Sequence, residues 1–210
     1  ADLSGWDTSK VENMSWMFWG CERLTTVKLS NTKNVTDMGY MFAGCSKLKE
    51  VELYHTENVK DMEHMFWGCA KLEETNLPTI DNVTNMNRMF IGCKKLTKIA
   101  LPHTEKVTDM GHMFEGCTNL KEVNLPNTES VENMFGMFMG CVKLTKVDLT
   151  NIGNVTDMSF MFARCKELQQ DFSSWDITNI KMKYDMFNLC TKMKQAKMKG
   201  NDLYPKGYEQ

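Results

Sequence analysis

The dipeptide Met-Phe recurs at a fixed interval along most of the chain, and this periodicity constrains the fold more than any other feature. Successive copies are 24 residues apart, except for a last interval of 25. A unit of this length cannot bury its own apolar side chains, but stacked units can bury them against one another. The sequence therefore predicts a solenoid. The Met residues of the dipeptide are Met17, Met41, Met65, Met89, Met113, Met137, Met161 and Met186.

Each unit also carries a strand signature. Residues 24–47 read LTTVKLSNTKNVTDMGYMFAGCSK, which begins with the pattern L-x-x-V-x-L. This pattern, at a period of 20–29 residues, is typical of leucine-rich repeats. Val27 and Leu29 alternate with the polar Lys28, so a strand here would have one apolar face. Strands from successive units should pair in parallel along one wall.

The second half of the unit has a different spacing. Val35, Met38, Met41 and Phe42 stand at offsets 0, 3, 6 and 7, which favours a short helical or 3₁₀ stretch on the opposite wall. We therefore predict an α/β repeat solenoid. It should be a right-handed leucine-rich-repeat stack, with a parallel β-sheet on one wall and short strands or helical turns on the other.

The two ends of the pattern depart from the middle. DLSGWDTSKV near the start and DFSSWDITNI at residues 171–180 each carry a Trp that the inner units lack at this point. Terminal repeats are usually atypical because their outer faces meet water. We predict one solenoid domain over residues 1–210. It divides into an N-terminal cap at 1–10, about eight repeats at 11–190, and a Lys-rich, partly helical cap or tail at 191–210.

The predicted core consists of columns in which each side chain packs on its counterpart in the next unit. Met, Phe and Cys fill three of these columns, and all eight Cys share one of them. The predicted core members are Met17, Phe18, Cys21, Met41, Phe42, Cys45, Met65, Phe66, Cys69, Met89, Phe90, Cys93, Met113, Phe114, Cys117, Met137, Phe138, Cys141, Met161, Phe162 and Cys165. Stacked Cys would have parallel Cβ vectors, which do not suit a disulfide, so we expect buried, reduced thiols.

Polar columns have structural explanations. Asn or Asp lies four residues before the Met of the dipeptide in seven of the eight units, as at Asn13 and Asp37, and such side chains can cap the backbone N–H groups of the following turn. The four His fall into two columns, and the members of each pair are two repeats apart. That separation, about 10 Å, is too long for one metal ion to be shared, so we expect surface His and no metal. The His pairs are His55 with His103, and His64 with His112.

Charge and motifs exclude several classes of function. Lys plus Arg number 25 and Asp plus Glu 27, a balance that argues against nucleic-acid binding. There is no run of 18 apolar residues, so we expect no membrane span, and residues 1–10 do not resemble a signal peptide. The sequence contains no H-E-x-x-H, G-x-S-x-G or phosphate-binding glycine loop, so we expect no enzyme and no cofactor.

Aromatic residues outside the core columns mark a candidate binding surface. Trp16, Tyr40 and Arg88 share the column before Met-Phe, while Trp19 and Trp67 share the column after Phe. An exposed apolar patch usually marks an interaction site. The alternative is that the rings lie flat and cover the convex wall.

A basic column offers a second surface. Its members could bind an anionic partner, or they could form a solvated face with cross-strand charge pairs, such as Lys28 beside Glu52. The basic members are Arg23, Lys47, Lys71, Lys95, Lys143 and Lys192.

The repeat resembles a known family. The pattern DLSxWDTSxVxNMSxMFxGC, and the M-x-x-M-F-x-G-C core from Asp2 to about Cys190, is similar to the repeat of BspA-type leucine-rich-repeat surface proteins. The resemblance implies a cell-surface or secreted adhesin or interaction module without enzymatic activity. Its partner would be a protein or glycan on a host or neighbouring cell. The inner repeats lack the W-D-T motif of the family.

Two alternatives remain open. The solenoids could self-associate in an extracellular filament or coat, which the uniform repeat length would suit. Reduced thiols would also be consistent with an intracellular leucine-rich-repeat adaptor.

Overall fold

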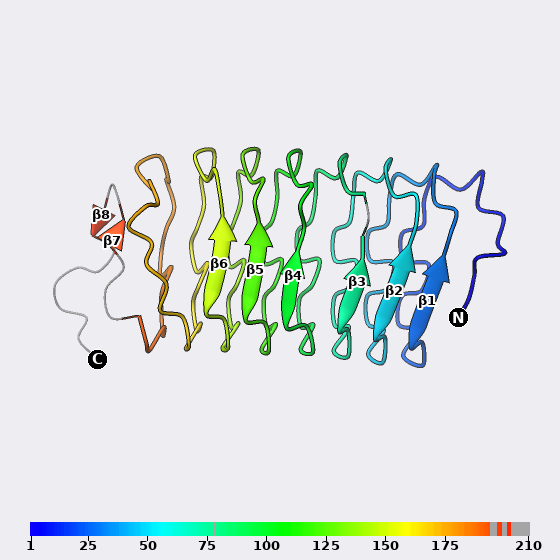
Figure 1. Cartoon of the computed structure of the whole chain (residues 1–210), viewed down its shortest axis with the longest axis horizontal. Helices are drawn as coiled ribbons and strands as arrows, with labels where there is room; N and C mark the ends of the chain where they lie inside the picture. Colours follow the sequence, from blue (N-terminus) through cyan, green and yellow to red (C-terminus); the bar gives the residue numbers. More distant parts are fainter. Residues whose placement is uncertain (78, 194–196, 199–200, 203–210) are drawn as a thin grey trace.

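The computed structural model describes residues 1–77, 79–193, 197–198 and 201–202 of the 210-residue chain. The chain winds as a β-solenoid whose coils lie in a row in sequence order (Figure 1). Short strands on one wall run in the same direction in successive coils. They are β1 (Thr26–Leu29), β2 (Glu50–Leu53), β3 (Glu74–Asn76), β4 (Lys98–Ala100), β5 (Glu122–Leu125) and β6 (Lys146–Leu149).

The strands pair in parallel at the register that the repeat predicts. Val27 lies opposite Val51, and Leu29 opposite Leu53. These side chains are buried, whereas Thr26 and Lys28 point outward, so the strand has the apolar and polar faces expected from alternation. Lys28 Nζ lies 3.4 Å from Glu52 Oε2, which confirms the predicted cross-strand charge pair.

The sheet is interrupted in the middle of the row. β1, β2 and β3 form one three-stranded sheet, and β4, β5 and β6 form another. At the interruption, Thr75 takes the core position that Val51 and Val123 occupy in other strands, and Ile99 of β4 is only partly buried. A shallow depression of about 660 Å³ lies here, with Thr75, Leu77 and Ile99 among its lining residues.

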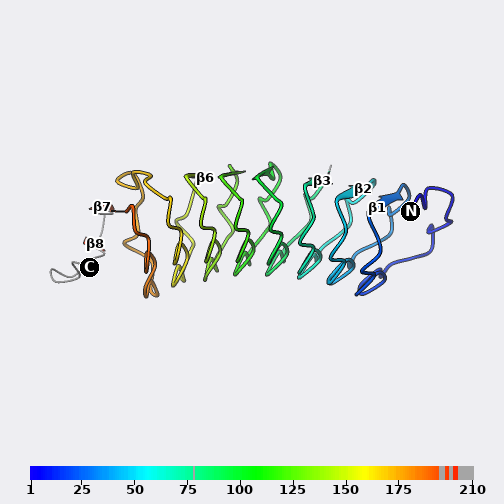
Figure 2. The same cartoon turned by 90° about the horizontal axis from the view of Figure 1, so that it is seen from below.

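A second ladder holds the coils together on the wall opposite the strands, which lie along the upper edge of the row in Figure 2. It consists of single parallel bridges between residues 24 or 25 positions apart, and it continues past the interruption between β3 and β4. It joins Asn13, Asp37, Asp61, Asn85, Asp109, Asn133, Asp157 and Met182 in order.

The predicted helical or 3₁₀ stretch on this wall is wrong for the described residues, none of which is helical. Alternate backbone N–H groups bond in different directions here. Met38 N and Phe42 N donate to Asp61 O and Met65 O of the next coil, at 3.0 Å each. Met41 N instead donates locally to Met38 O at 3.2 Å. A helix would use all of its N–H groups locally. This wall is therefore a series of turns that are hydrogen-bonded to the next coil.

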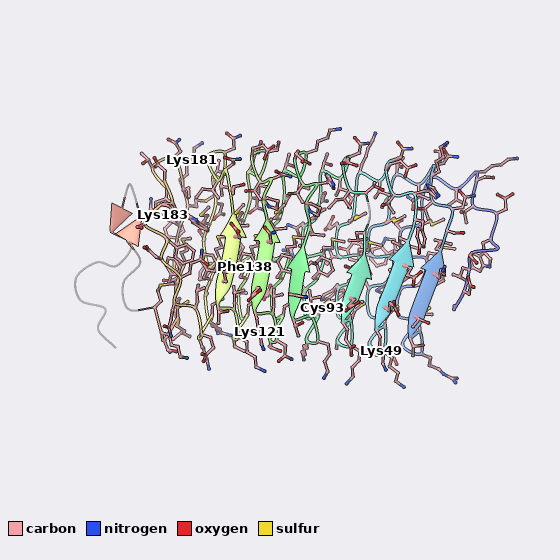
Figure 3. The ribbon with its side chains drawn as sticks, viewed as in Figure 1. Lys49, Cys93, Lys121, Phe138, Lys181 and Lys183 are labelled. Atoms are coloured by element: carbon pink, nitrogen blue, oxygen red, sulfur yellow. The ribbon has the colours of Figure 1, made fainter. Side chains whose placement is uncertain are left out.

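The predicted core columns are confirmed along most of the row. Phe rings of successive coils stack almost parallel, with 5.5 Å between the centroids of Phe90 and Phe114 and 5.6 Å between those of Phe114 and Phe138. Met, Phe and Cys of these columns are fully buried from Met41 to Cys165. Phe138 and Cys93 are labelled among the interior side chains in Figure 3.

The first coil is the exception to this burial. Met17 is 41% exposed, Cys21 is exposed and Phe18 is only partly buried. Each core side chain is covered by its counterparts on both sides, and in this chain these three residues have such a counterpart on one side only. The prediction that they belong to the buried core is therefore wrong for Met17 and Cys21.

The ends of the row are described in part. In the predicted N-terminal cap, Asp2 bridges to Lys28, so this segment lies alongside β1. In the predicted C-terminal tail, β7 (Lys197–Met198) and β8 (Asn201–Asp202) pair antiparallel, which contradicts a helix at those positions. The rest of the tail beyond residue 193 lies outside the described residues. In the described part of the chain, no helix is long and apolar enough to cross a bilayer.

Candidate binding surface

The turns opposite the sheet place one column of side chains at an unusual backbone conformation. Tyr40 is the third residue of the turn from Met38 to Met41 and has a φ of 58°. A turn of this kind requires a positive φ at that residue, where glycine or asparagine is usual. The same column has φ values between 54° and 62° at Trp16, His64, Arg88, His112 and Phe160, and Gly136 has 58°. Large side chains thus occupy a strained position that glycine would adopt freely.

The column brings aromatic rings of successive coils into contact. Trp16 and Tyr40 stack with 4.0 Å between ring centroids and 6° between planes. Tyr40 and His64 stack with 4.3 Å and 10°. Each pair of stacked rings contributes an estimated 0.5–1.5 kcal/mol beyond the burial of its area. Stacking therefore offsets part of the cost of the left-handed backbone.

Two indoles flank this stack. Trp19 meets Trp16 edge-on, with 5.9 Å between ring centroids and 66° between planes. Trp67 meets His64 edge-on, with 6.0 Å between centroids and 82° between planes. Their side chains belong to the most exposed large apolar residues: Trp16 is 51%, Trp19 57% and Trp67 45% exposed. We call Trp16, Trp19, Tyr40, His64 and Trp67 together the aromatic wall.

Carboxylates line the same coils. Asp37 Oδ1 and Asp61 Oδ1 accept hydrogen bonds from Gly39 N at 2.8 Å and Glu63 N at 2.7 Å, which confirms the predicted capping role of this column. Asn13 Nδ2 donates to Asp37 Oδ2 at 3.0 Å. These bonds hold the carboxylates in place without neutralising their charge.

His64 is part of this surface and not the simple surface residue that the sequence predicted. Its ring stacks on Tyr40, and its Nδ1 lies 3.0 Å from Glu63 Oε1 without hydrogen-bonding geometry. Burial lowers the pKa of His64, and the nearby Glu63 carboxylate opposes that shift in part. The ring is therefore neutral at neutral pH and stacks as an uncharged aromatic group.

Beyond Arg88, ring contacts continue along the row, but one of the rings comes from the residue before the column. His112 leans over Gly136, where an added Cβ would lie 2.9 Å from His112 Nδ1. The ring centroid of the neighbouring Phe135 lies 4.9 Å from that of His112 and 5.6 Å from that of Phe160. A shallow hollow of about 560 Å³ lies beside these residues and is lined also by Arg88.

The structure brings together four of the five predicted binding residues. Trp16, Trp19 and Tyr40 form one cluster, and Trp67 joins it through His64. Arg88 occupies the next position of the column, and its Nη1 donates to Asn87 Oδ1 at 2.8 Å. Sequence reasoning did not identify His64 as the link, although its position in the Trp16–Tyr40 column was the available signal.

The thiols do not form a reactive centre. Cys45 Sγ donates to Phe18 O at 3.1 Å, and the same bond to the preceding coil recurs down the column to Cys190. Burial raises the pKa of the Cys45 thiol to about 11 and that of Cys117 to about 12. Buried thiols of this kind stay protonated at neutral pH and are poor nucleophiles. All eight Cys are free, as the sequence predicted, and only Cys21 is exposed.

One group of side chains combines metal-ligating atoms from adjacent coils. Ligand atoms of Asp81, His103 and Glu105 lie within 4.8 Å of one another. His103 Nδ1 is 3.4 Å from Asp81 Oδ1, and Glu105 Oε1 accepts a bond from Asn127 Nδ2 at 2.8 Å. The spacing of the two His columns gives no sign of this group, because two of its three ligands are carboxylates. Because Asp81 and His103 are exposed and already contact each other, we assign no ion to it.

Comparison with protein families gives two overlapping matches. Residues 1–101 and 84–200 match a family described as Mycoplasma protein of unknown function, DUF285. The chain belongs to this family. The match confirms the resemblance to BspA-type leucine-rich-repeat proteins. A search of curated proteins gives no match.

Solved structures share the fold of this DUF285 protein. A leucine-rich repeat protein of T. pallidum is 26% identical with a TM-score of 0.62, over 81% of this chain and 78% of its own. One from Bacteroides ovatus is 20% identical, TM-score 0.57, over 89% of this chain and 58% of its own. One from Eubacterium ventriosum is 21% identical with a TM-score of 0.58, over 99% of this chain and 48% of its own. These likenesses confirm a leucine-rich-repeat solenoid, and the chain spans about half the length of the last two.

Proposed function

We propose that this chain is a non-enzymatic binding module, displayed on the cell surface or secreted, that attaches to a protein or glycan on a host or neighbouring cell. The observation that supports this role most directly is the aromatic wall. Trp19 and Trp67 are about half exposed although they lie beside a well-packed core. Solvent-exposed aromatic clusters of this kind commonly act as binding hot spots.

The strained backbone adds to this argument. Bulky residues at a positive φ cost an estimated 1–3 kcal/mol each, and such strain often occurs at sites of function. Glycine at position 136 shows that this column accepts a residue without a side chain. The rings of Trp16, Tyr40 and His64 are thus not needed to form the turn, and binding a partner is a role that fits them.

The test is binding of the purified chain to arrays of cell-surface proteins and glycans, combined with antibody labelling of intact source cells. Trp19→Ala and Trp67→Ala should each abolish most of the signal. Trp6→Ala is the matched control, because Trp6 is 46% exposed but belongs to the N-terminal segment that bridges to β1, and its ring contacts none of the rings of the wall. Equal binding by all three variants would contradict the proposal, and labelling only after permeabilisation would contradict display outside the cell.

Self-association is a second candidate, and exposed apolar side chains in the first and last coils favour it. Met17 and Trp19 are 41% and 57% exposed in the first coil. Tyr184 and Leu189 are 70% and 54% exposed in the last described coil. Two unlike apolar end faces would pair head to tail and give an open filament. Size-exclusion chromatography over a wide concentration range tests this, and a monomer throughout would exclude it.

A further inference from the structure

The spacing of the two flanking indoles limits what a linear partner can present to them. Trp19 and Trp67 are two coils apart, and the coil between them has the fully buried Ala43 at the same position. Coils pair at about 4.8 Å, so equivalent positions two coils apart are separated by about 9.6 Å. Trp19 and Trp67 therefore branch from backbone positions about 9.6 Å apart, and the only side chain at the position between them is the methyl group of Ala43.

The orientation of the rings sets the direction of that partner. Trp16, Tyr40 and His64 stack along the row of coils. Trp19 and Trp67 stand at 66° and 82° to the rings that they contact, so their planes run along the row. An elongated ligand that follows the row would meet both indoles in turn.

Of the two extended peptide conformations, one matches this interval. In a β-strand, side chains on one face recur every two residues, about 6.6 Å apart. A polyproline II helix has three residues per turn and a rise of about 3.1 Å, so side chains on one face recur about every 9.3 Å. This is close to the estimated 9.6 Å between equivalent positions two coils apart. Aromatic-lined surfaces recognise proline-rich segments in this conformation, because the peptide loses little entropy on binding.

The charge of the wall selects between ligands of similar shape. Residues 13–19, 37–43 and 61–67 contain the carboxylates Asp37, Asp61 and Glu63 and no Lys or Arg. The charge of Arg88, in the next coil, also acts on Tyr40 and His64, so the carboxylates outnumber this cation by three to one. A peptide with basic residues would gain from these charges, and from cation–π contact with the indoles, whereas a neutral glycan gains nothing from the carboxylate charge.

We propose that the aromatic wall binds a proline-rich, basic segment of a partner protein in the polyproline II conformation, with prolines three residues apart on Trp19 and Trp67. This inference rests on the binding role proposed above and specifies its partner. The row of Asp37, Asp61 and Glu63 lies beside the arginine or lysine residues of that segment.

The experiment is a titration of the full chain, followed by tryptophan fluorescence, with defined probes. The probes are two arginines followed by ten prolines, two glutamates followed by ten prolines, two arginines followed by five Gly-Ser pairs, and chitohexaose. The first probe should bind at least about tenfold more tightly than each of the others, because it alone combines shape and charge. Equal binding of the Gly-Ser probe, or binding of chitohexaose with no binding of the first probe, would overturn the inference.

Variants locate the site. Trp19→Ala and Trp67→Ala should each weaken binding of the first probe by about tenfold or more, and Trp6→Ala should change it by less than about twofold. The triple variant D37N/D61N/E63Q removes three charges while keeping an acceptor oxygen for the caps at positions 37 and 61. It should reduce the preference for arginine over glutamate and the dependence of affinity on salt. Unchanged selectivity in the triple variant would refute the charge assignment.

The outcomes separate this inference from the broader binding role. If partners found on the arrays still require Trp19 and Trp67 but the proline probe does not bind, only the inference fails. If neither the arrays nor the probes depend on these indoles, both fail. Far-UV circular dichroism of each variant identifies any loss of binding that comes from unfolding.

Discussion

The ring of Tyr40 lies parallel to that of Trp16, 4.0 Å away, although both residues have left-handed backbone torsions, at φ 58° and 62°. The stack therefore depends on two residues that are held in a conformation usually left to glycine. A left-handed backbone costs a residue with a Cβ an estimated 1–2 kcal/mol. The contribution of the ring and the cost of the backbone can be separated by substitution.

We predict that Tyr40→Ala is less stable than Tyr40→Gly by about 1 kcal/mol, because alanine keeps the strain and loses the ring, whereas glycine loses both. Urea denaturation of the two variants measures the difference. Ser46 is the control position, since it is exposed and has no positive φ. There the order should reverse, with the alanine variant more stable. A more stable alanine variant at both positions would show that Tyr40 is not strained.

The sequence predicted the walls of the solenoid but not the conformation of its turns. Period and alternation placed β1 to β6 and the core columns, because every coil repeats the same apolar positions and stacks in register. The offsets of Val35, Met38, Met41 and Phe42 suggested a helix, since apolar spacing reports which side chains face inward and not which atoms accept the hydrogen bonds. The glycine at Gly44, with φ 76°, and its equivalents did not distinguish the two, because a glycine in this conformation also commonly ends a helix.

The sequence likewise predicted which residues of the candidate site lie together, but not how their rings are arranged. Column position alone brought Trp16, Trp19, Tyr40 and Trp67 to one end of one wall. It could not give the orientation of the rings, which depends on rotamers and on the turn torsions. The sequence predicted His64 as a surface residue because the separation of the His pairs excludes a shared metal ion. That argument says nothing about stacking on Tyr40 or contact with Trp67.

The column of capping Asn and Asp side chains should tolerate replacement of a carboxylate by an amide, but not loss of the side chain. Asp109 Oδ1 accepts bonds from Gly111 N at 2.8 Å and from the side-chain amides of Asn87 and Asn133 at 3.0 Å each. Asp109→Ala leaves these donors without this acceptor and should cost about 1 kcal/mol or more. Asp109→Asn keeps an acceptor, as Asn85 does in its own coil, and should cost less. Urea midpoints compare the two variants, and equal losses would argue against a capping role.

Position along the row should set the cost of removing a core ring. Phe114 is fully buried and stacks on both sides, against Phe90 and Phe138. Phe114→Ala should destabilise the chain by about 3–5 kcal/mol through lost burial and a residual cavity. Phe18 is partly buried and stacks only on Phe42, so Phe18→Ala should cost clearly less. Chemical denaturation gives both values, and similar losses would mean that the first coil is covered in solution.

Thiol reactivity should divide the column of Cys in the same way. Cys21 is exposed, whereas the other seven are buried and donate to carbonyls of the preceding coil. In native protein we expect one thiol to react rapidly with a disulfide reagent, and all eight to react in urea. Cys21→Ser should remove the rapid phase. Several rapid thiols in the native wild type would contradict the buried column.

The buried thiols also make stability dependent on alkaline pH. Burial raises the pKa of Cys45 from 9.0 to about 11 and that of Cys117 from 9.0 to about 12, so between these values the unfolded chain ionises while the folded chain stays protonated. The unfolded state then binds fewer protons, and the free energy of unfolding falls as pH rises above about 9. Each thiol contributes a slope of at most about 1.4 kcal/mol per pH unit. Thermal unfolding from pH 8 to 10.5 should show this fall, and it should be shallower in the double variant C45A/C117A. A double variant that loses stability as steeply as the wild type would assign the fall to other groups.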